Sequence, residues 1–114
     1  MERVNAGKME YRIQGKSGPK YLFRGPRLDW GLIRFLPGET LGKHYHEQVE
    51  ETFYFTAGSG IIRVNDVDHK IAPGDAFRIE PGETHDIINT GREPLDGIFI
   101  KHCYLPDDKV SCPK

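Results

Sequence analysis

The sequence has no sustained helical period and no apolar run near the roughly 18 residues of a membrane-spanning helix. Its amino-terminal stretch, MERVNAGKMEYRI, also lacks the apolar core of a signal peptide. Charge of neither sign prevails, since 16 Lys and Arg face 17 Asp and Glu for a net charge of -1, and no basic run is interleaved with aromatic residues. We therefore expect a cytoplasmic protein with no membrane partner and no nucleic-acid partner.

Cysteine is scarce, because the chain has only Cys103 and Cys112, with eight residues between them. This spacing suits neither a zinc motif nor a disulfide framework, so we expect reduced thiols. A disulfide, or a second metal site that includes His102, is a less favoured alternative. A chain of 114 residues can fold without disulfides and bury about two thirds of its unfolded surface. We expect a single domain over residues 1–114.

Glycine and proline are abundant instead, with 13 and 8 residues, and they divide the sequence into short runs typical of β-strands. This pattern predicts an all-β sandwich or barrel. The expected strands cover residues 9–14, 21–24, 28–36, 44–46, 51–56, 59–64, 69–71, 76–79, 84–89 and 95–104. The polar residues 106–114 are expected to lie over the surface.

Several of the boundaries between these runs carry turn signals. Type II turns are predicted at Pro37-Gly38, Pro73-Gly74 and Pro81-Gly82. In each pair the proline fixes φ at the second turn position and the glycine accepts a positive φ at the third. Asn65 and Asp66 predict a tight hairpin, because both residue types tolerate the left-handed conformations that it requires.

The expected strands place ligand-type side chains close together. His44 and His46 are two residues apart on one strand, so both imidazoles point to the same side and can reach one ion. Glu50 and Glu51 compete for the next position. Glu51 lies on the same strand face as Phe53, whereas Glu50 lies on the more polar face. Because the more apolar face should line the barrel, the alternation selects Glu51.

Two spaced motifs contain these residues. The first runs from Gly38 through His44, His46 and Glu51 to Gly58, and the second runs from Gly74 through Gly82 and His85 to Asn89. Together they resemble the two signature motifs of the cupin superfamily over residues 32–100, departing only at Glu80, where the family usually has proline. The resemblance implies a single-domain cupin, with a jelly-roll-type β-barrel of two antiparallel sheets. It also implies that His44, His46, Glu51 and His85 bind one metal ion.

Three imidazoles and one carboxylate suit a divalent transition metal, namely Mn, Fe, Co, Ni, Cu or Zn, and affinity alone does not choose among them. Cupins include dioxygenases, decarboxylases and isomerases as well as proteins without catalysis. We favour a metal-dependent enzyme that acts on a small oxygen-rich molecule. The alternative is a non-catalytic module that binds or senses a small metabolite through the same ion. No residue outside the four ligands stands out as a general acid or base, so no catalytic residue is assigned.

The pocket beside the ion is expected to have apolar walls formed by Phe53, Phe55 and Ile87, while most other apolar residues fill the barrel. An open-ended barrel has exposed strand edges, and the amino-terminal strands are candidates to pair with a second copy. We therefore expect a homodimer, which the resemblance also implies.

Overall fold

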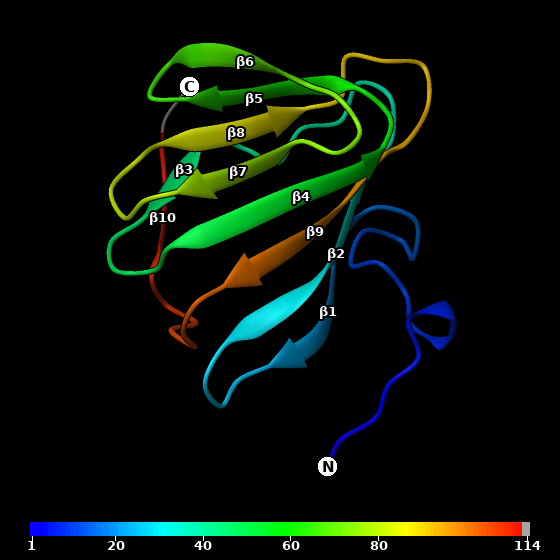
Figure 1. Cartoon of the computed structure of the whole chain (residues 1–114), viewed down its shortest axis with the longest axis vertical. Helices are drawn as coiled ribbons and strands as arrows, with labels where there is room; N and C mark the ends of the chain where they lie inside the picture. The colour runs from blue at the N-terminus through cyan, green and yellow to red at the C-terminus, as the bar shows by residue number, and fades with distance from the viewer. Residues whose placement is uncertain (113–114) are drawn as a thin grey trace.

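The computed structural model describes residues 1–112, which form ten β-strands and one short 3-10 helix. The strands lie in two sheets, ordered β1-β2-β9-β4-β7 and β10-β3-β8-β5-β6, and the strand pairs within each sheet are antiparallel (Figure 1). Their bounds are β1 Gly18–Arg24, β2 Asp29–Phe35, β3 His44–His46, β4 Glu51–Ala57, β5 Gly60–Val64, β6 Val67–Ile71, β7 Ala76–Ile79, β8 His85–Ile88, β9 Leu95–Lys101 and β10 Lys109–Ser111, and the helix η1 spans Ala6–Lys8. The predicted all-β fold of two antiparallel sheets is confirmed.

Side chains alternate between the core and the outer face along the central strands. In β2, every second residue from Asp29 to Phe35 is buried, and β4 and β9 begin with the same alternation. The buried side chains of the two sheets meet in one core of Ile33, Phe35, Phe53, Phe55, Ile62, Ile71, Ile79, Ile87, Leu95 and Phe99. Each fully buried Phe or Ile contributes about 1.5 to 3 kcal/mol relative to an exposed one. This core packs the two sheets against each other and includes residues of β4 and β8, two of the strands that carry the candidate site.

The three predicted type II turns are confirmed, and they share a further feature. In each turn the glycine has a positive φ, of 85° at Gly38, 94° at Gly74 and 84° at Gly82. The fourth residue of each turn is acidic, and its carboxylate accepts a hydrogen bond from the backbone N–H of the first residue. The pairs are Glu39 with Leu36 at 2.7 Å, Asp75 with Ala72 at 2.8 Å and Glu83 with Glu80 at 2.7 Å. The carboxylate therefore rigidifies turns that proline and glycine already favour.

The hairpin between β5 and β6 is also as predicted. Val64 pairs with Val67, so the loop consists of Asn65 and Asp66 alone. Their φ angles of 49° and 65° are both left-handed, which matches the twist of the flanking strands.

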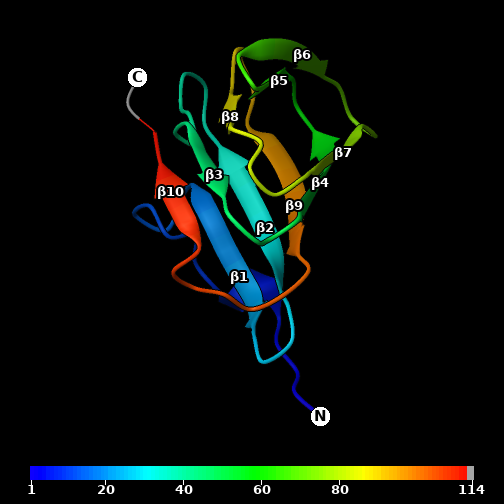
Figure 2. The ribbon, with the colours of Figure 1, turned by 90° about the vertical axis from the view of Figure 1, so that its left-hand side faces the viewer.

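The ends of the chain differ from the prediction. Residues 9–14 do not form a strand, because Gln14 and Gly15 adopt positive φ angles and fold the segment back on itself through two isolated bridges, Tyr11 with Gly15 and Ile13 with Ser17. This segment lies beside β1 and β2, outside the two sheets (Figures 1 and 2). Near the other end, β10 was not predicted, yet it pairs with β3. Residues 113 and 114 of the predicted surface tail lie outside the described residues.

Cys103 and Cys112 are both free thiols and half-buried. Within residues 1–112, no helix is long and apolar enough to cross a membrane.

Candidate metal centre

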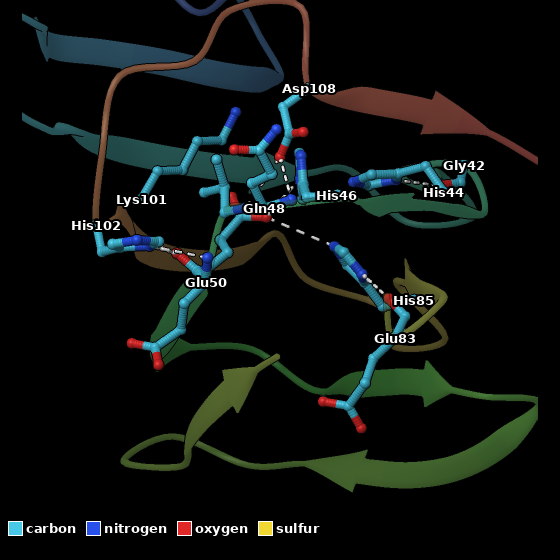
Figure 3. Close-up of polar contacts among 12 residues, drawn as sticks. Gly42, His44, His46, Gln48, Glu50, Glu83, His85, Lys101, His102 and Asp108 are labelled. Carbon is cyan, nitrogen blue, oxygen red and sulfur yellow. Dashed lines mark hydrogen bonds and ion pairs between the residues drawn. The ribbon is translucent and has the colours of Figure 1, made fainter. Parts of the chain in front are cut away.

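Four ligand-type side chains converge at one end of the two sheets. His44 and His46 come from β3, His85 begins β8, and Glu51 begins β4 of the opposite sheet. One donor atom from each residue lies within 4.8 Å of the donors of the other three, and all four residues are buried. Figure 3 shows the three imidazoles around a common point. The structure thus brings together every residue that the sequence proposed as a metal ligand.

The strand register decides which of two neighbouring carboxylates faces this cluster. Glu51 is 5% exposed and points inward with Phe53. Glu50, the residue before β4, is half-buried, and its side chain points away from the imidazoles in Figure 3. The predicted orientation of Glu51 is confirmed. The backbone of Glu50 is tied to the outer surface, since its N–H donates to Nδ1 of His102 at 2.8 Å.

Two of the imidazoles are oriented by backbone carbonyl oxygens. Nδ1 of His44 lies 2.7 Å from the carbonyl oxygen of Gly42, and Nδ1 of His85 lies 3.1 Å from that of Glu83. A carbonyl can only accept, so each Nδ1 carries the proton and Nε2 keeps its lone pair. Metal-binding histidines are commonly held in this way.

The cluster contains buried nitrogen atoms without hydrogen-bond partners. Nε2 of His46 and Nε2 of His85 are buried and make no hydrogen bond. The nearest acceptor, Oε1 of Glu51, is 3.3 Å from the first and 3.5 Å from the second, and neither contact has hydrogen-bond geometry. Leaving buried polar atoms unsatisfied costs about 1 to 3 kcal/mol each. A divalent transition ion would satisfy these nitrogens and the carboxylate together, so the residues present fit a metal.

The protonation states favour the same fit. Burial alone would raise the pKa of Glu51, but the imidazoles of His46 and His85 and the charge of Lys101 outweigh it and lower the pKa to about 2. Burial, together with the neighbouring His85, lowers the pKa of His44 to about 4. At neutral pH the carboxylate is therefore ionised and the His44 imidazole is neutral, which are the states that bind metal ions.

A cavity of about 240 Å³ opens beside the cluster. His44, His46 and Glu51 form part of its wall, and Phe53 and Phe99 contribute apolar surface. Three cationic side chains also line it, namely Arg12, Lys101 and Lys109. Small oxygen-rich ligands with negative charge suit a cavity of this size and sign.

The predicted pocket residues occupy two different places. Phe53 lines the cavity, whereas Phe55 and Ile87 are fully buried in the core and are not part of the cavity wall. Phe55 shares its strand face with Phe53 but lies one pleat further along β4, where it packs against Phe77 with ring centroids 6.1 Å apart. Tyr21 and Lys101 also line the cavity and were not predicted from the sequence. Lys101 could have been found, because alternation along β9 places it on the same face as Phe99.

A second hollow, of about 370 Å³, lies on the outer surface near Lys43 and Arg63 and includes none of the four clustered residues. Its two cationic side chains are already paired, since Lys43 lies 2.9 Å from Asp66 and Arg63 lies 2.6 Å from Asp68. We therefore place the functional site at the inner cavity.

Comparison with known proteins agrees with this geometry. Residues 31–101 match the model of the cupin domain. An oxalate-binding protein from Thermotoga maritima is 38% identical over 100 residues, which cover 88% of this chain and 82% of the relative. Among solved structures, a conserved protein with a double-stranded β-helix domain from Klebsiella pneumoniae superposes with a TM-score of 0.84 at 16% identity, over 100% of this chain and 99% of the other. Oxalate oxidase superposes with a TM-score of 0.68 at 19% identity, over 75% of this chain and 46% of the other. The two structural likenesses show the fold alone.

Proposed function

The chain belongs to the cupin family, and from this premise we propose that it uses one divalent transition-metal ion to bind a small carboxylate anion of the oxalate class. His44, His46, Glu51 and His85 would hold the ion. The observation that carries the proposal is the pair of buried Nε2 atoms without partners, which lie beside an ionised carboxylate. Bound there, the ion would supply a Lewis-acid centre for an oxygen donor of the ligand.

The charge of the cavity supports an anionic ligand. Three cationic side chains and one carboxylate line it, and a divalent ion would add to the positive charge. Phe53 and Phe99 limit the water that can screen these charges, which strengthens their effect. The relative from Thermotoga maritima, which is named for oxalate binding, supports the same ligand class.

A second candidate is a metal-dependent enzyme that acts on the same kind of oxygen-rich molecule, as a dioxygenase, decarboxylase or isomerase. One observation favours it. The hydroxyl of Tyr21 accepts a hydrogen bond of 2.8 Å from the Lys101 ammonium at the cavity wall, and such a pair can pass a proton to or from a bound molecule.

The test begins with elemental analysis of protein purified without added metal. Calorimetry then follows the titration of oxalate into metal-free protein and into protein loaded with Mn²⁺ or Zn²⁺. We expect one ion per chain and oxalate binding only in the loaded protein. Equal oxalate binding with and without metal, or no metal uptake, would refute the proposal. Oxygen uptake and carbon dioxide release, assayed on the same samples, separate a binding protein from an enzyme.

A further inference from the structure

Lys101 lies directly beside the cluster of ligand-type residues. It is the last residue of β9 and pairs with Glu51 in the antiparallel ladder between β4 and β9. Residues that face each other in such a ladder point to the same side of the sheet. The Lys101 side chain therefore enters the cavity from the strand next to Glu51, and it forms part of the cavity wall (Figure 3).

The ammonium group of Lys101 is held in place but is not neutralised. It donates a hydrogen bond to the hydroxyl of Tyr21, at 2.8 Å. Within residues 1–112, no carboxylate lies within ion-pair distance of this ammonium. Asp29 faces Lys101 from β2, but its Oδ1 accepts the N–H of Gly25 at 2.7 Å. On the outer face of the same sheet, by contrast, Arg34 pairs with Asp96 at 2.6 Å.

Tyr21 is itself a fixed support. Its ring packs edge-on against the buried Phe99, with centroids 4.9 Å apart. Arg12 and Arg24 lie over the same ring, at 5.4 and 4.9 Å from its centroid, and the Lys101 ammonium is at 5.4 Å. A phenol hydroxyl among three cations keeps the lysine directed into the cavity without cancelling its charge.

We propose that Lys101, positioned by Tyr21, determines the specificity of the site by binding a second negative charge on the ligand. The inference rests on the proposed function, because the first anionic group of the ligand is assigned to the metal. A small dicarboxylate supplies a negative group to the ion and another to the ammonium. A monocarboxylate leaves one of these two cations without an anionic partner, and a neutral sugar leaves both, so the site should select dianions.

The experiment compares a dianion with a monoanion of similar size. Oxalate and glycolate are titrated into the metal-loaded full chain of the wild type, of Lys101→Met and of Lys70→Met. Lys70 is an exposed residue of β6, on the other sheet, and serves as the matched control. We expect Lys101→Met to weaken oxalate binding by about tenfold to a hundredfold, the usual range for a lost hydrogen bond to a charged group. Glycolate binding should change much less, and Lys70→Met should behave as the wild type.

Three further measurements make the result decisive. Metal affinity, measured by chelator competition without any anion, should not fall in Lys101→Met, because the lysine charge repels the ion. Lys101→Arg should keep the preference for oxalate. Tyr21→Phe should reduce that preference while the charge remains, and this variant decides the matter if Lys101→Met does not fold.

An unchanged ratio of oxalate to glycolate affinity in Lys101→Met and Tyr21→Phe overturns the role of Lys101 alone. A metal-loaded wild type that binds neither anion overturns the proposed function as well.

Discussion

His44 faces His85 across the antiparallel pair of β3 and β8, with ring centroids 4.2 Å apart. Together with His46 these rings belong to one sheet, whereas Glu51 belongs to the other. An ion bound by all four residues would therefore link the two sheets at one end of the core. In this arrangement, metal binding would be coupled to the stability of the whole fold.

Metal binding should raise thermal stability. An ion present at a hundred times its dissociation constant stabilises the folded state by about 2.7 kcal/mol. For a domain of this size, that corresponds to an increase in melting temperature of roughly 10 °C. Differential scanning calorimetry of protein treated with a chelator, before and after addition of Mn²⁺ or Zn²⁺, measures the shift. His85→Ala should remove most of it, and an equal shift in this variant would show that the ion binds elsewhere.

Glu51→Gln should weaken metal binding by at least about tenfold, because a neutral amide oxygen replaces the buried carboxylate. Glu50→Gln is the matched control, since this neighbour precedes β4 and its side chain points away from the imidazoles. Its effect on metal affinity should be negligible. Competition against a chromophoric chelator measures both variants, and equal losses would contradict the assignment of Glu51 as the ligand.

The strand alternation and the turn motifs predicted an all-β fold and the inward direction of Glu51, whereas the arrangement in two antiparallel sheets was implied by the resemblance to cupins. The alternation and the turns did not predict β10, because it depends on pairing with a distant part of the chain, such as Val110 with Tyr45. The looped segment before β1 was also missed, because it turns at Gln14, whose φ of 54° is uncommon for a residue other than glycine. Asn89, the last residue of the second motif, illustrates a similar limit. Its buried amide donates to the carbonyl oxygens of Phe35 and Glu93 at 2.7 and 2.9 Å, a structural role that only the folded chain reveals.

The metal-free protein should lose stability as the pH falls below about 6.5. Burial lowers the pKa of His44 from 6.5 to about 4 in the folded protein. The unfolded chain therefore binds more protons between these values, and stability rises with pH across that window. Folding also lowers the pKa of Glu51, from 4.5 to about 2. The stabilisation from its ionised carboxylate is present above the unfolded pKa and is lost as the pH falls toward the folded pKa, so Glu51 adds a further loss of stability at lower pH.

Each of these groups contributes a slope of at most about 1.4 kcal/mol per pH unit. Denaturant unfolding at pH values from 7 to about 4, in the presence of a chelator, measures the combined effect. His44→Gln should flatten the profile between about 4 and 6.5, while replacement of the exposed His69 by Gln should leave it unchanged. A wild-type stability that is constant over this range would contradict the prediction.

We predict a homodimer in solution. β1 is the end strand of its sheet. On its outer edge the carbonyl oxygen of Pro19 accepts the N–H of Arg12, so the part of that edge beyond Pro19 is the candidate to pair with a second copy. Light scattering at micromolar concentration should give twice the chain mass of 13.0 kDa. A mass equal to that of one chain would reject the dimer without affecting the metal site.

The turn before β8 should control metal affinity separately from stability. Gly82 has a φ of 84° and open space where a Cβ would stand, and Gly74 has the same features in the equivalent turn before β7. Alanine at either position should cost about 1 to 2 kcal/mol of folding free energy through the left-handed conformation. Only the turn at Gly82 contacts the cluster, because its N–H donates to the carbonyl oxygen of His46 at 2.7 Å and the next carbonyl, of Glu83, orients His85.

Gly82→Ala should therefore weaken metal binding about tenfold, the lower end of the effect seen when groups that orient ligands are lost. In the control turn, the N–H of Gly74 donates to the carbonyl oxygen of Phe55 at 2.8 Å. Gly74→Ala should destabilise the fold to a similar extent with little change in metal affinity. Urea unfolding gives the stabilities of the metal-free variants, and chelator competition gives their affinities. If both variants lost affinity in proportion to their stability, the turn would act through global folding and not by orienting His85.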